Sequence, residues 1–132
     1  MIADICLELR QFHVEVVART NLVTVPVMME LIDAIAGAVR NKARSRVLLE
    51  VIAPKCLITL FDRVEIWAYA VRSGLQGVRI AHVITGRPVK DEDAETFKED
   101  YAHNRGILVS TFTDRAHALA WLNGTRVLAL QH

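Results

Sequence analysis

Cysteine is scarce in this 132-residue chain, which contains only two. Cys6 and Cys56 lie in unrelated segments, and neither has a second cysteine or a histidine at the spacing of zinc ligands. The five histidines are scattered, and no two of them are four residues apart. We therefore expect two reduced thiols, no disulfide, no metal site and no cofactor.

Long apolar runs and an excess of one charge sign are also missing. No segment approaches the roughly 20 apolar residues of a membrane-spanning helix, and residues 1–4 lack the features of a secretory signal. We expect no membrane span and a cytoplasmic location.

The net charge is only +1, and the basic run at 40–46 stands at a helix end, where cations are favourable. The sequence therefore predicts no nucleic-acid partner.

Apolar residues, in contrast, are abundant. They make up 52% of the chain, and the mean hydropathy is +0.26. A chain of this length can bury a core on both sides of a sheet without a disulfide or a metal ion. Such a high hydropathy in a small protein indicates that apolar surface is buried against a second chain, so a homodimer is one predicted form.

Short apolar runs alternate with helical stripes along the chain. A period of two or a short continuous apolar run predicts a strand, and apolar residues three and four apart predict a helix. Strands are expected at 5–10, 12–19, 46–52, 78–84 and 107–112, a loop at 53–59, and helices after Thr24, from Leu60, from 91–93 and after Thr113-Asp114. We predict an α/β fold with a single open, mostly parallel sheet of about five strands and four helices, ordered β-β-α-β-α-β-α-β-α. The domain covers 1–124, and the tail at 125–132 is expected to pack on the domain or on a partner chain.

The helix that begins at Leu60 is apolar beyond one face. Phe61, Ile66 and Tyr69 lie partly off its main apolar stripe. Because a helix that packs on one side needs only one apolar stripe, the other apolar residues need a second surface to cover them. We expect these three residues to form a self-association or partner surface.

Two further segments carry expectations about the core. In the helix that begins at 91–93, Ala94, Phe97 and Tyr101 are expected to point inward. His82 is a polar side chain in the middle of a strand that is otherwise expected to be buried. Because buried polar groups are usually satisfied by a neighbour, we interpret it as a core imidazole with a hydrogen bond, in preference to a ligand or an acid–base group.

Several segments carry a resemblance to a known family. They are Arg79-Ile80-Ala81-His82-Val83, Arg105-Gly106-Ile107, Phe112-Thr113-Asp114 and Ala118-Leu119-Ala120-Trp121-Leu122. Together with the element order, they make the chain similar to the STAS fold, and more narrowly to its SpoIIAA-like branch of small bacterial proteins akin to anti-sigma-factor antagonists. The resemblance spans nearly the whole chain. It implies a non-enzymatic regulatory or protein-interaction module.

The resemblance also implies a regulatory position. In the antagonists, the serine of an Asp-Ser pair, at the start of the helix after the third strand, is phosphorylated, and this breaks binding to a partner kinase. The corresponding residue here is Thr59, which is therefore predicted as a phosphorylation site. Ile58 stands where the family has Asp, and Leu60 and Phe61 follow where small residues are usual. Taken alone, a threonine before a helix is most often its N-cap, which is the alternative interpretation.

The residues that follow the strands suggest where a ligand would bind. Open α/β sheets bind ligands outside the carboxyl ends of their strands, and helix N-termini at that edge favour anions. The predicted contact residues are Lys55, Thr59, Arg87, Lys90 and Thr113. They predict a small anionic ligand or an acidic partner surface.

No catalytic residues are predicted. The serines Ser45, Ser73 and Ser110 do not lie on a nucleophile elbow, and no glycine-rich phosphate loop follows a strand.

Three functions stay open. The first is a STAS-like interaction module with an unknown protein partner. The second is a carrier or sensor of a small anionic or amphipathic ligand, and the third is an enzyme that uses His82 near Cys56 or Thr59.

Overall fold

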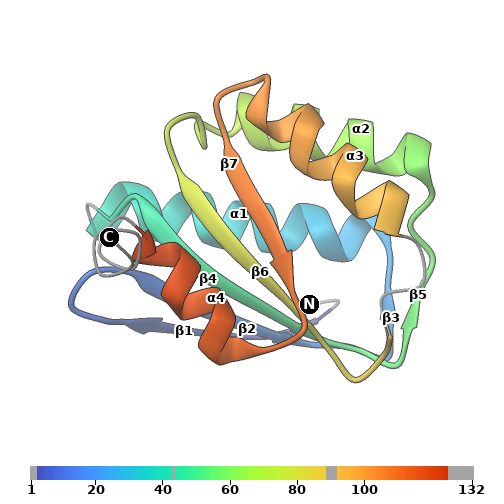
Figure 1. Ribbon diagram of the computed structural model, residues 1–132, viewed down its shortest axis with the longest axis horizontal. Coiled ribbons are helices and arrows are strands. Elements are labelled where there is room, and N and C mark those ends of the chain that lie inside the picture. Colours follow the sequence, from blue (N-terminus) through green and yellow to red (C-terminus); the bar gives the residue numbers. More distant parts are fainter. Residues whose placement is uncertain (1–2, 43, 89–91, 125–132) are drawn as a thin grey trace, which may run out of the picture.

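The computed structural model describes residues 3–42, 44–88 and 92–124, which form seven strands and four helices (Figure 1). In chain order these are β1 (Asp4–Leu9), β2 (Val14–Arg19), β3 (Leu22–Val23), α1 (Val25–Lys42), β4 (Arg46–Ile52), β5 (Lys55–Cys56), α2 (Leu60–Arg72), β6 (Arg79–Thr85), α3 (Glu92–His103), β7 (Leu108–Phe112) and α4 (Arg115–Leu122). Lys90, the side chain of Ala94 and the tail at 125–132 lie outside the described parts. The predictions made for them are therefore not tested.

Five strands make the main sheet, in the order β1-β2-β4-β6-β7. β1 runs antiparallel to β2, and all the other neighbours in this sheet pair in parallel. The predicted α/β class, with four helices and a mostly parallel five-stranded sheet, is confirmed. β4 and β6 occupy central positions, and their nearly continuous apolar sequences suit strands that are covered on both faces.

A second, two-stranded sheet corrects the prediction of a single sheet. The segment at 53–59 was expected to be a loop, but it contains β5, which pairs in parallel with β3. Leu22 lies opposite Lys55 and Val23 opposite Cys56. Strands of two residues are too short to show an alternating pattern, which is why the sequence does not indicate them. The pairing holds the segments before α1 and α2 together beyond the carboxyl ends of β2 and β4.

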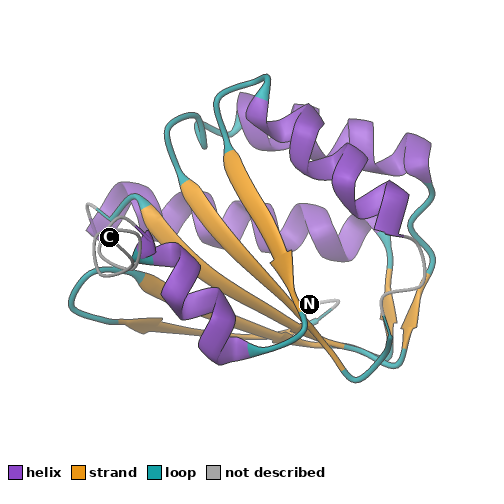
Figure 2. Ribbon diagram, viewed as in Figure 1, coloured by secondary structure: helices purple, strands orange, loops and turns teal. Residues whose placement is uncertain are grey.

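The helices cover the two faces of the main sheet unequally. α1, α2 and α3 lie on one face, and α4 lies on the other (Figures 1 and 2). The chain passes from β2 to β4, then to β6 and then to β7, each time to the next strand in the same direction across the sheet. Because crossovers between parallel strands share one handedness, the three helices in these connections lie on the same face. The smaller core under α4 consists of Leu48, Ala81, Val83, Ala118 and Leu122.

Among the described residues, no helix combines the length and apolar character needed to cross a bilayer.

The inward face of α3 differs from the prediction. Tyr101 packs against the core as predicted, although it is only partly buried. Phe97, in contrast, is 37% exposed, whereas Lys98 is only 4% exposed. A lysine can occupy this position because its ammonium group contacts both Glu95 and His82. Hydrophobic patterning assigns a lysine to the solvent side and a phenylalanine to the core, so the sequence alone misplaced Lys98 and Phe97.

Candidate functional site

The predicted contact residues do not come together in one site. Lys55 is exposed on β5, and Thr59 is exposed at the start of α2. Arg87, after β6, lines a cavity between the sheet and the helices. Thr113 belongs to a different hollow. Lys90 is beyond the part of the chain that the structure describes.

Thr59 is the N-cap of α2. Its hydroxyl accepts a hydrogen bond from the backbone N–H of Asp62 at 3.0 Å, and its own N–H donates to the Asp62 carboxylate at 2.9 Å. This reciprocal pair is a capping box, which satisfies backbone donors that the first turn leaves free. The capping interpretation is confirmed, and phosphorylation of Thr59 stays a prediction.

Exposed apolar side chains flank this cap. Leu57 is 66% exposed, Leu60 50% and Phe61 83%. We call these three residues the α2 patch. Of the other predicted surface residues, Tyr69 is half-buried against the core, and Ile66 is 2% exposed. The prediction for Ile66 is corrected, because this residue lies on the face of α2 that packs inward.

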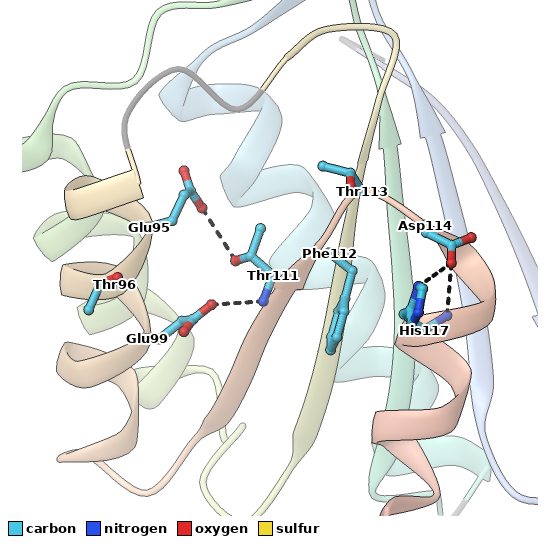
Figure 3. Close-up of a pocket in the computed structure, with 8 residues that line it drawn as sticks. All are labelled: Glu95, Thr96, Glu99, Thr111, Phe112, Thr113, Asp114 and His117. Carbon is cyan, nitrogen blue, oxygen red and sulfur yellow. Dashed lines mark hydrogen bonds and ion pairs between the residues drawn. The ribbon is translucent and has the colours of Figure 1, made fainter.

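An open hollow of about 450 Å³ lies between α3 and the start of α4 (Figure 3). On its α3 side, Glu99 accepts a hydrogen bond from the backbone N–H of Thr111 at 2.8 Å, and Glu95 accepts one from the Thr111 hydroxyl at 3.4 Å. Asp114, beside Thr113, caps α4. The hollow that Thr113 lines therefore also contains three carboxylates, whereas Arg87 lines a cavity in which cations outnumber carboxylates.

The buried cavity is built around His82. The parallel register places His82 opposite Leu49 of β4 and Thr111 of β7. The imidazole is 7% exposed, and its Nδ1 lies 2.9 Å from Nζ of Lys98 on α3. The interpretation of His82 as a core imidazole with a neighbouring partner is confirmed.

Ion pairs extend this contact across three elements. Lys98 Nζ donates to Glu95 Oε1 at 2.6 Å, and Arg63 Nη2 on α2 donates to Glu95 Oε2 at 3.1 Å. The other arm of the guanidinium, Arg63 Nη1, donates to the backbone oxygen of Ile58 at 3.0 Å. The network thus joins β6, α3, α2 and the segment that leads into α2.

Burial and charge together set the protonation states of this cluster. Burial lowers the pKa of His82 well below 6.5, and the nearby Lys98 charge lowers it further. Burial by itself would raise the pKa of Glu95, but the charge and hydrogen bond of Lys98 lower it to about 2. Burial lowers the pKa of Lys98, and Glu95 opposes that shift. At neutral pH the imidazole of His82 is therefore neutral and Glu95 is ionised. The 2.6 Å contact of Glu95 with Lys98 Nζ has the geometry of an ion pair.

The cavity has a volume of about 40 Å³. Its polar lining comes from Cys56, Arg63, His82, Arg87, Glu95 and Lys98. Two buried nitrogen atoms in this lining, His82 Nε2 and Arg87 Nε, have no hydrogen-bond partner among the described residues. Within the same residues, no three histidine, cysteine or acidic side chains gather in a way that could hold a metal ion.

Sequence reasoning missed Arg63, Glu95 and Lys98. Each is a charged residue on a helix, and such residues normally face solvent. One signal was present, because a buried His82 requires a polar partner on a covering element. Periodicity alone could not say which helix would supply that partner.

The chain matches no family model, no curated protein and no solved structure. By its fold and its site, the chain is an α/β domain with a buried, positively charged cavity next to an exposed apolar patch.

Proposed function

We propose that the chain is a non-enzymatic, STAS-like regulatory module that binds a partner protein through the α2 patch. The observation that carries this proposal is the exposure of Leu57, Leu60 and Phe61 within five consecutive residues. Single exposed apolar side chains are ordinary, but a contiguous group of large ones indicates a surface that another molecule covers.

The position of the patch supports a regulatory role. The STAS resemblance places the regulatory position at Thr59, which lies between Leu57 and Leu60 in the sequence. A phosphate on the exposed Thr59 hydroxyl would put about two negative charges among apolar side chains. Such a charge would oppose apolar docking, because the partner would have to desolvate it.

The patch also rests on a rigid support. The capping box fixes the first turn of α2, and Arg63 ties that turn to the backbone of Ile58. Side chains on a fixed support lose little backbone freedom when they bind. Burial of one such large apolar side chain contributes about 2 kcal/mol.

The test compares Phe61→Asp with Phe12→Asp, which changes an aromatic residue that is also exposed but lies before β2. Partners are enriched from native cells with the tagged full chain, then purified and measured by calorimetry. We expect Phe61→Asp to weaken binding at least about tenfold and Phe12→Asp to leave it unchanged. Both variants should keep the stability of the wild type within about 0.5 kcal/mol, because both sites are at the surface.

Light scattering on the same proteins identifies a second copy of the chain as the partner if the wild type is dimeric and Phe61→Asp is monomeric. The proposal fails if no purified protein, including the chain itself, binds the wild type. It also fails if the two aspartate variants lose binding equally. Mass spectrometry of Thr59 from native cells tests the phosphorylation separately.

A further inference from the structure

We propose that the buried cavity between the main sheet, α2 and α3 binds a small planar oxyanion, such as a carboxylate, bicarbonate or nitrate. This cavity lies under the segment before α2, since Cys56 and Ile58 line it. It is separate from the α2 patch, whose residues do not line it. The inference therefore does not depend on the proposed protein partner.

The hydrogen-bond pattern around His82 identifies what is missing from the cavity. Lys98, held as an ammonium group by its 2.6 Å ion pair with Glu95, can only donate to Nδ1 of His82. A neutral imidazole that accepts at Nδ1 carries its proton on Nε2. His82 Nε2 is therefore a buried N–H donor, and no acceptor reaches it from the described residues.

Arg87 supplies a second donor of the same kind. Its Nε is buried without a hydrogen-bond partner, and no described carboxylate forms an ion pair with its guanidinium group. A guanidinium group has only donors, so what it lacks is an acceptor. Two unsatisfied donors in one cavity lining are matched by a ligand with at least two acceptor oxygens.

The charges of the lining favour an anion. Arg63, Arg87 and Lys98 contribute three positive charges, and Glu95 contributes one negative charge. With His82 neutral, the lining has an excess of two positive charges. Uncompensated buried charge is costly, so an anion that enters would relieve repulsion as well as fill hydrogen bonds.

The size of the cavity limits the ligand. A water molecule needs at least about 10–15 Å³ of such space, so a cavity of about 40 Å³ holds about three non-hydrogen atoms or slightly more. A carboxylate, bicarbonate or nitrate group meets this limit. Phosphate, which is tetrahedral and has five non-hydrogen atoms, exceeds it.

The experiment follows the His82 ring by ¹⁵N NMR while the full chain is titrated with formate, nitrate or phosphate, at an ionic strength held constant with chloride. We expect the free protein to show the Nε2–H tautomer, and formate and nitrate to shift the Nε2–H signal saturably. Arg87→Gln should weaken this binding about tenfold, the loss of one charged hydrogen bond. Arg72→Gln, which removes an exposed cation of α2 outside the cavity, should bind as the wild type does.

Three results would overturn the proposal. One is an imidazole protonated on Nδ1, which would remove the unsatisfied donor. Another is a wild-type Nε2–H signal that no oxyanion shifts beyond the chloride background, which would mean a cavity filled with water only. The third is equal affinity in wild type and Arg87→Gln. The partner-binding test with Phe61→Asp, whatever its outcome, has no bearing on any of them.

Discussion

At the scale of single residues, the burial of Lys98 is the most consequential feature of the structure. A lysine that is 4% exposed must be paired, and Glu95 and His82 provide its partners. Glu95 in turn pairs with Arg63, so one carboxylate compensates two cations. Removal of the Glu95 charge would leave both cations without their ion-pair partner.

We therefore predict that Glu95→Gln destabilises the protein by about 3 kcal/mol at pH 7, as breaking a buried ion pair does. The effect should depend on pH. The pKa of Glu95 is lowered from 4.5 to about 2, so its contribution is fully present above pH 4.5 and is lost as the pH falls to about 2. Urea unfolding at several pH values measures this difference.

The control for this experiment is Glu65→Gln, which neutralises an exposed carboxylate on α2. It should change stability by less than about 0.5 kcal/mol at any of these pH values. If the gap between wild type and Glu95→Gln stayed constant from neutral pH down to the acid range, the ionised pair would not be its source.

At the scale of elements, the start of α2 combines two features that usually occur apart. The capping box of Thr59 and Asp62 stabilises the first turn, and the exposed Leu60 and Phe61 stand in that same turn. An ordinary helix start exposes polar side chains. Here the cap holds apolar side chains toward solvent, which is the arrangement that a docking surface requires.

We predict that Thr59→Ala destabilises the protein by about 1 kcal/mol, because the N–H of Asp62 loses its acceptor. Thr59→Ser keeps a hydroxyl and should remain close to the wild type. Chemical unfolding monitored by circular dichroism compares the three proteins. Equal stability of the alanine and serine variants would contradict a structural contribution of the cap.

At the scale of the whole molecule, three helices lie on one face of the main sheet and α4 lies on the other (Figure 2). Side chains from all three helices of the first face line the cavity. The segment from β5 to α2 has two sides. Cys56 and Ile58 line the cavity, while Leu57 is exposed in the α2 patch. Whatever occupies the cavity therefore contacts the underside of the segment that carries part of the patch.

We predict that formate slows amide hydrogen exchange in residues 56–60. An anion held by His82 and Arg87 beneath this segment would reduce its local opening, because opening would then require the anion to leave. Exchange measured by mass spectrometry with and without formate tests this. Amides of α4, on the opposite face, serve as the internal control, and an equal change there would indicate a general salt effect.

The sequence was sufficient for most of the local structure. The period of two identified β1 and β2, and short apolar runs identified the other strands of the main sheet. Thr59 and Asp114 were recognisable as helix caps. These features depend on neighbours within a few residues, so a single sequence contains them. The strands β3 and β5 escaped because two residues cannot show a period.

Only the tertiary structure decided the cavity. His82 and Lys98 are 16 residues apart, and Arg63 and Glu95 are 32 apart. Their meeting depends on the register of β6 and on the rotation of α2 and α3 about their axes, which packing of the whole chain determines. Composition predicted that a core would form, and the caps predicted where helices begin. Which charged side chains entered that core followed from long-range pairing, because buried charges are stable only where their partners arrive too.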